Sequence, residues 1–201
     1  GAYRATKYLI ELGHKKIGLI HGPLYYTEDL LDSLYEHSFQ FNIWNQRIEG
    51  YLKAMKEHNL RVEPRYTEIG DGAANRGIIS GRHAIKRIIG GREGAQEYLK
   101  RENRPTAICA QNDQMAIGAI NGAIECGLRV PDDLSIIGQD GIDISKMLHP
   151  YLTTIEQPRY EIGHTAASII IKMLETNKIH ENITIGSKLI IGESTKRYKG
   201  D

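Results

Sequence analysis

The stretch TAICA (residues 106–110) is followed by the polar triplet QND (residues 111–113) and then by QMAIGAINGAIE (residues 114–125). The first run is apolar nearly throughout, which predicts a strand buried on both faces and not a half-exposed one. The third run has the length and the Ala-, Met- and Ile-rich composition of a helix. The triplet between them therefore predicts the connection of a strand–loop–helix unit.

The same unit recurs along the chain. Short apolar runs predict strands at residues 17–20, 66–69, 106–110, 134–138, 152–155 and 188–191. Helical periodicity predicts helices at residues 3–12, 46–58, 78–89, 114–125 and 162–175, the third of them stopped by Gly90 and Gly91. Strands and helices that alternate in this way predict an α/β fold, a doubly wound, mostly parallel sheet with helices on both faces.

A sheet of this kind binds ligands at the carboxyl ends of its strands. The connections expected there are residues 22–47, 70–77, 111–113 and 138–142. Three of the four place short polar residues directly after a strand, which is the arrangement of a binding site.

The composition limits the possible functions. Of the 201 residues, 40% are hydrophobic and 25% are charged, with 26 basic against 25 acidic side chains. These charges are interleaved, so we expect no basic surface for nucleic acid, and no apolar run approaches the roughly 20 residues of a membrane helix. Cys109 and Cys126 have no partner at metal-ligand spacing, so we expect two buried free thiols.

Catalysis is not expected from this sequence. The eight histidines are scattered, and no nucleophile elbow, zinc-binding motif or Ser/Lys pair is present. The glycine-rich segment 70–77 lacks the Gly-Lys-Ser/Thr ending of a phosphate-binding loop. The sequence therefore predicts no cofactor and no metal.

Several segments, in order, carry a family resemblance. They are ATKYLIELGHKKIGLI (5–20), RPTAI (104–108) with NDQMAIGA (112–119), GLRVPDDLSIIG (127–138), and PYLTTIEQP (150–158) with ES at 193–194. Together they resemble the signature blocks of the lactose/galactose-repressor (LacI/GalR) family over nearly the whole chain.

This resemblance implies the effector-binding region of a transcriptional repressor, with a periplasmic-binding-protein-like fold. Family members bind a sugar, nucleoside or purine between two lobes, form dimers, act in the cytoplasm and contact DNA through a helix-turn-helix domain absent from these residues. The resemblance further implies that residues 1–156 and 187–201 form the carboxy-terminal lobe and that residues 157–186 cross to the amino-terminal lobe. A periplasmic sugar-binding protein of a transporter, which shares the two-lobe architecture, is the alternative.

The resemblance also implies which residues bind the ligand. Asp140 matches an aspartate that accepts hydrogen bonds from ligand hydroxyls, and Arg47 matches an arginine whose planar fork reaches the ligand. Asn112, which offers a donor and an acceptor, is expected to contact the ligand, whereas Asp113 is expected to cap the following helix. Gln139 stands where the family usually has Phe.

Two further candidates lie in less regular segments. Residues 25–45 are longer than the corresponding family loop and contain both phenylalanines and the only tryptophan of the chain. Trp44 is a candidate for stacking on a sugar or purine, although packing within the insertion is the favoured interpretation of these rings. Asp71, in the glycine-rich segment, is a candidate because it aligns with a family loop beside the ligand.

Overall fold

The computed structural model describes residues 1–21, 43–62, 67–69, 82–100, 102–177 and 182–200. Strands and helices alternate along the chain, as predicted. The elements are α1 (Ala2–Glu11), β1 (Ile17–His21), α2 (Ile43–Glu57), β2 (Thr67–Ile69), α3 (Arg82–Leu99), β3 (Ala107–Ala110), α4 (Asp113–Glu125), β4 (Ser135–Asp140), the 3-10 helix η4 (Asp143–Lys146), β5 (Thr153–Glu156), α5 (Arg159–Thr176) and β6 (Lys188–Ile190).

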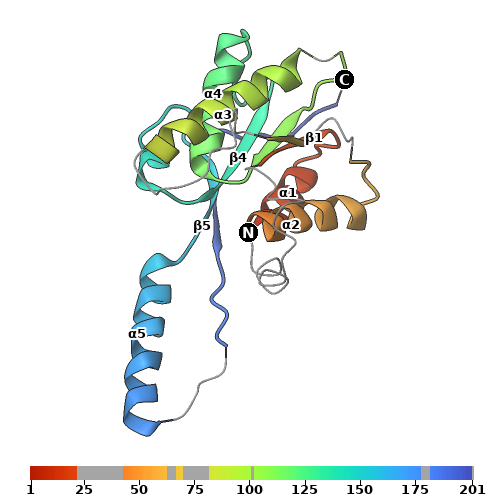
Figure 1. Ribbon diagram of the computed structural model, residues 1–201. Coiled ribbons are helices and arrows are strands. Elements are labelled where there is room, and N and C mark those ends of the chain that lie inside the picture. Colours follow the sequence, from red (N-terminus) through yellow and green to blue (C-terminus); the bar gives the residue numbers. More distant parts are fainter. Residues whose placement is uncertain (22–42, 63–66, 70–81, 101, 178–181, 201) are drawn as a thin grey trace, which may run out of the picture.

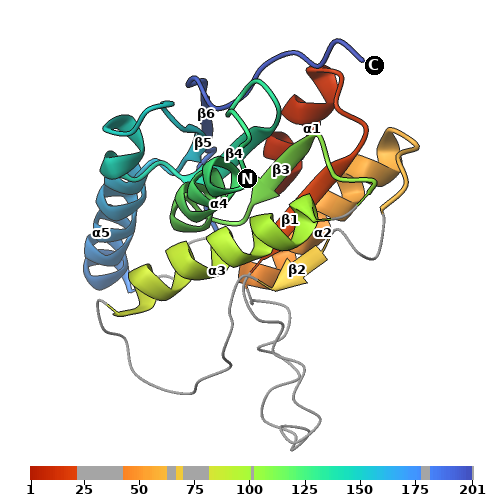
Figure 2. The same cartoon turned by 90° about the horizontal axis from the view of Figure 1, so that it is seen from above.

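These strands form one sheet in the order β2-β1-β3-β4-β5-β6. The first five run parallel, and β6 returns antiparallel to β5. Helices α1 and α2 cover one face, and α3 and α4 cover the other (Figures 1 and 2). The predicted mostly parallel α/β fold with helices on both faces is confirmed.

Each face of the sheet has its own apolar core. Ile20, Ile108 and Ile136 pack with α3 and α4, whereas Leu19 and Ile137 pack with α1 and α2. Successive residues of a strand point to opposite faces. A strand that serves both cores must therefore be apolar at consecutive positions, which explains the unbroken apolar runs in the sequence.

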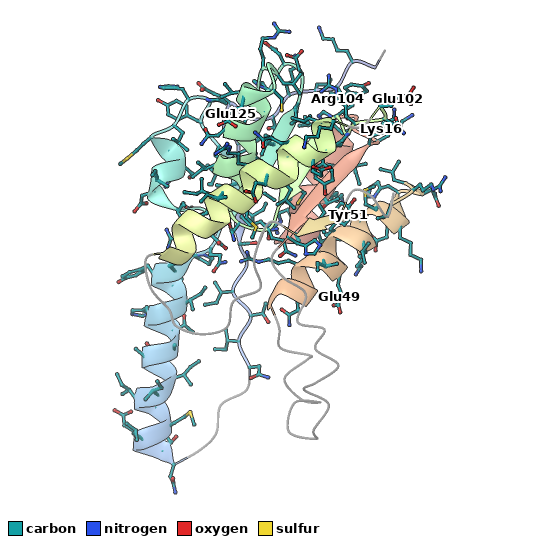
Figure 3. All side chains as sticks on the ribbon, turned by 45° about the horizontal axis from the view of Figure 1, so that its top comes forward. Lys16, Glu49, Tyr51, Glu102, Arg104 and Glu125 are labelled. Atoms are coloured by element: carbon teal, nitrogen blue, oxygen red, sulfur yellow. The ribbon has the colours of Figure 1, made fainter. Side chains whose placement is uncertain are left out.

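Tyr51 fixes the position of α2 against the sheet. Its side chain, labelled in Figure 3, is fully buried, and its hydroxyl donates to the main-chain oxygen of Ile17 at 2.8 Å. Residues four apart lie on the same face of a helix, so Arg47 also faces the sheet, one turn nearer the start of α2. The helix begins at Ile43, three residues before the predicted start.

Two expectations about the helices on the other face are wrong. Helix α3 continues through Gly90 and Gly91 to Leu99. Gly91 serves a close crossing with α4 and not a helix end, since a Cβ there would lie 2.1 Å from the main-chain oxygen of Met115. Cys126, expected to be buried like Cys109, is exposed, because it follows the last turn of α4.

Helix α5 differs from the other helices. None of its residues is buried, and it stands away from the sheet, with the chain returning beside it to β6 (Figure 1). Its last turn ends at Asn177, in the left-handed conformation with φ 51°. None of the helices in the described ranges is both long enough and apolar enough to cross a membrane.

Candidate functional site

A charged pair lies at the carboxyl end of the sheet. Asp140 ends β4, and Arg47, from α2, donates through Nη2 to Asp140 Oδ1 at 2.6 Å. The side chains are 11% and 28% exposed, respectively, so the pair is partly shielded from water. Nη1 of Arg47 donates to the main-chain oxygen of Gln111, directly after β3. One guanidinium therefore connects α2, β3 and β4, and brings two predicted site residues together.

Gln157 and Arg159 also hold Asp140 in place. Nε2 of Gln157 donates to the same Oδ1 at 2.7 Å, and the Arg159 guanidinium donates to the main-chain oxygens of Asp140 at 3.2 Å and Gly141 at 3.0 Å. Asp140 has φ 111°, a conformation that costs ~1–3 kcal/mol in a residue other than glycine and persists only where neighbours enforce it. The sequence reasoning missed both residues, although Gln157 lies two residues after the end of a predicted strand and directly after the observed β5.

Asn112, and not the predicted Asp113, caps α4. Asn112 Oδ1 accepts a hydrogen bond from the Met115 main-chain N–H at 2.8 Å. The assignment reverses because Asn112 has extended backbone just outside the helix, from where a side chain can reach the first-turn N–H groups. Asn112 Nδ2 is buried and has no hydrogen-bond partner among the described residues. Such a donor costs ~1–3 kcal/mol when it stays unsatisfied, so it would favour a ligand that presents an acceptor.

Asp113 turns its carboxylate away from its own helix. Thr154 Oγ1 donates to Oδ1 at 2.5 Å, and the main-chain N–H of Ile142 donates to Oδ2 at 2.8 Å. Burial raises the pKa of Asp113 to about 6, because the charged form loses its hydration. Asp113 thus lies behind the rim of the sheet, whereas Asp140 lies on it.

Residues 6–195 match the periplasmic binding protein-like domain family. The chain belongs to this family.

Within this family, the chain is similar to transcriptional repressors. It is 36% identical over 197 residues to the HTH-type transcriptional repressor PurR of Histophilus somni, covering 98% of this chain and 50% of that protein. The chain therefore spans about half the length of the curated relative. The predicted resemblance to LacI/GalR regulators is confirmed.

Solved structures agree with this assignment. A regulatory protein of the LacI family from Chloroflexus aggregans superposes with a TM-score of 0.76 at 31% identity, over 98% of this chain and 61% of that one. A LacI family transcriptional regulator from Enterococcus faecium, solved with bound ribose, gives a TM-score of 0.75 at 26% identity, over 99% and 63% of the two chains.

The remaining candidates of this periplasmic-binding-protein-like domain are less well placed. Asp71 lies outside the described residues, and so do the side chain of Trp44 and nearly all of segment 25–45. Gln139 is buried, and its Nε2 has no partner within the described part of the chain. In that same part, no group of three or more His, Cys, Asp or Glu side chains could hold a metal ion.

Proposed function

We propose that this chain is the effector-binding lobe of a LacI/GalR-type transcriptional repressor, and that a small polar ligand binds at Arg47, Asn112 and Asp140. The observation that carries this proposal is the Arg47–Asp140 pair at 2.6 Å, with Asn112 Nδ2, which has no partner among the described residues, at the same rim of the sheet. The similarity to a repressor and to a regulator that binds ribose supports it. Trp44 and Asp71 remain candidates for the rest of the site.

The chemistry of the rim favours a neutral ligand rich in hydroxyl groups. Arg47 and Asp140 neutralise each other, so an anion or a cation would gain little there. Oδ1 of Asp140 already accepts two hydrogen bonds, while Oδ2 accepts none from the described residues. A hydroxyl can donate to Oδ2 and another can accept from Asn112 Nδ2. A sugar supplies both groups, and a purine-like ligand, with amino donors and ring-nitrogen acceptors, is the second candidate.

The arrangement of lobes follows from the same proposal. Residues 1–156 and 187–201 form the carboxy-terminal lobe, and residues 157–186 cross to a second lobe that covers the ligand from the other side. The unburied helix α5 supports this crossing. A ligand held by both lobes shifts their arrangement only by its differential affinity for the two states, typically ~1–3 kcal/mol. Gln157 and Arg159, which contact Asp140, begin the crossing segment and connect it to the site.

The proposal also includes the partners of the chain. It is expected to form a homodimer, for which the exposed apolar side chains of Ile144, Met147 and Tyr151 provide a surface. Contact with DNA belongs to a helix-turn-helix domain elsewhere in the full-length protein, which acts in the cytoplasm. Neither catalysis nor a cofactor is part of this function.

The alternative function is that of a periplasmic sugar-binding protein, which shares the family fold. Such a protein would bind sugar but no operator DNA.

The test is calorimetric titration of the full-length protein with D-ribose, D-galactose and adenosine. We expect one of these to bind, and Asp140→Asn to weaken its binding about tenfold or more, because charge-assisted hydrogen bonds are roughly twice as strong as neutral ones. Asp132→Asn, at an exposed ion pair with Lys196, is the matched control and should bind as the wild type does. Equal affinity of Asp140→Asn and wild type would remove Asp140 from the site.

A further inference from the structure

Asp113 is a buried acid that the proposed ligand contacts do not use. Its side chain is fully buried at the first position of α4. It accepts from Thr154, on β5, and from the main chain of Ile142, beyond the end of β4. The Asp113 carboxylate therefore connects α4, β5 and the turn that follows β4.

That turn is the one that carries Asp140. Asp140 has φ 111° and Gly141 has φ 66°, so the chain leaves β4 through two consecutive residues with positive φ. A non-glycine residue in this conformation must be held by its surroundings. The hydrogen bond from the Ile142 N–H to Asp113 fixes the chain two residues after Asp140. Arg159 fixes the main-chain oxygens of Asp140 and Gly141, which precede Ile142.

The Asp113 carboxylate lies directly beside Gly138. A Cβ at Gly138 would lie 2.3 Å from Asp113 Oδ1, 3.0 Å from a methyl carbon of Leu152 and 3.2 Å from the Cβ of Ala116. Any side chain at position 138 would displace the carboxylate, so the acid occupies the space that the glycine leaves. The same strand supplies both this space and, two residues later, the carboxylate of the rim.

We propose that Asp113 is a positioning residue, which holds the turn of residues 140–142 so that the Asp140 side chain meets Arg47 and the ligand. The part of this inference that concerns the ligand rests on the proposed function. The part that concerns the turn rests on the contacts of Asp113 alone.

If the proposal holds, protonation of Asp113 should make ligand affinity depend on pH. Burial raises the pKa of Asp113 to about 6, and the nearby negative charge of Asp140 acts in the same direction. A protonated carboxyl loses an acceptor site, so one of its two hydrogen bonds weakens below this pH. Ligand affinity should then fall between pH 7.5 and pH 5.5.

Other charged groups at the rim need controls. Arg47 and Arg159 are charged side chains that contact Asp140 or the turn after it. His21, buried at the end of β1, is of a residue type that titrates near this pH. His21→Gln should therefore retain the fall in affinity if Asp113 causes it.

The experiment compares Asp113→Asn and Thr154→Val in the full-length protein. Asparagine at position 113 keeps the shape of the side chain but replaces one carboxylate oxygen with an NH2 group, which would face the donor of Ile142 or Thr154. Valine at position 154 removes the hydroxyl group at nearly constant side-chain size. We expect amide hydrogen exchange at Ile142 to become about tenfold faster in Asp113→Asn, and D-ribose affinity at pH 7.5 to fall about tenfold. The pH dependence of affinity should disappear in this variant.

Each outcome decides the proposal. Unchanged exchange at Ile142 would overturn it whatever the ligand is. A lower melting temperature with unchanged D-ribose affinity and pH profile would show a purely structural role, and would also overturn it. If wild type binds no D-ribose, the choice of ligand fails, and exchange at Ile142 still decides the role of Asp113. If Asp113→Asn does not fold, Thr154→Val takes its place and should show the same faster exchange.

Discussion

His14 is the residue that joins the turn after α1 to the end of the chain. Its ring bonds Thr106 Oγ1 through Nδ1 at 3.0 Å and the main-chain oxygen of Lys196 through Nε2 at 3.1 Å, and it stacks on Tyr198 with centroids 5.4 Å apart. Since a carbonyl oxygen only accepts, Nε2 carries a proton. Desolvation lowers the pKa of His14 below its ordinary value of 6.5, so the folded protein favours the neutral ring.

His14 makes the stability of the folded protein depend on pH. The pKa of His14 is lower in the folded than in the unfolded state, so its contribution is complete above about pH 6.5 and is lost as the pH falls through the folded-state pKa. The free energy of unfolding should therefore fall more steeply below pH 6.5 in wild type than in His14→Gln, which does not titrate. Urea denaturation between pH 5 and pH 8 measures both slopes.

Asp113 acts in the opposite sense and needs its own control. Its pKa of about 6 lies above the ordinary value of 3.8, so its contribution is complete below pH 3.8 and is lost as the pH rises through about 6. The double variant His14→Gln with Asp113→Asn separates the two effects. Parallel slopes for wild type and His14→Gln would contradict the assignment to His14.

At the scale of elements, the crossing of α3 and α4 depends on three glycines. A Cβ at Gly118 would lie 1.9 Å from the main-chain oxygen of Ile88, and one at Gly122 would lie 2.5 Å from the oxygen of Arg92. Together with Gly91, these residues let the two backbones touch. The exposed ion pair of Arg92 and Glu125, at 2.8 Å, also connects the two helices. Glycine lowers helix propensity by about 1 kcal/mol, and close packing offsets this loss.

Adding one methyl group at this crossing tests the interpretation. Gly118→Ala should lower the free energy of unfolding by about 3 kcal/mol, because the helices must separate to admit the Cβ. Gly94→Ala, on α3 with only ordinary contacts of 3.5–3.7 Å to Ile20, is the matched control. It should raise stability by ~0.5–1 kcal/mol through helix propensity. Similar effects of the two substitutions in urea denaturation would show that the crossing is not close.

At the scale of the whole molecule, α5 is a helix with no buried residue. Ile170 and Leu174 are 57% and 81% exposed. A helix gains most of its stability from an apolar face packed on other elements, and each large side chain that stays in water forgoes ~1.5–3 kcal/mol. The isolated 201-residue chain therefore presents an apolar face that the proposed second lobe would cover.

We expect this isolated chain to self-associate through α5. Size-exclusion chromatography with light scattering should show species larger than a monomer, and the double substitution Ile170→Glu with Leu174→Glu should reduce them. Met147→Glu, on the lobe itself and 77% exposed, tests the rival dimer surface. A monomeric wild-type chain with α5 still exposed would count against the crossing segment.

Much of the fold was predictable because its signals are local. The apolar run at residues 106–110 and the periodic run after it specify a strand and a helix through their own side chains, without reference to distant residues. The strand-end rule then placed Asn112 and Asp140 at one rim. The helix stop at Gly90 and Gly91 was wrong because a glycine pair looks the same at a helix end and at a close helix crossing.

The sequence by itself determined the order of strands and helices, the sheet with two covered faces and the edge where polar side chains gather. Only the tertiary structure decided which of those side chains share hydrogen bonds. Arg47 meets Asp140 across 93 residues of chain, and Gln157 joins them from a third element. Period and propensity describe each segment separately, whereas a hydrogen bond depends on where two segments meet, and packing of the whole chain sets that meeting point.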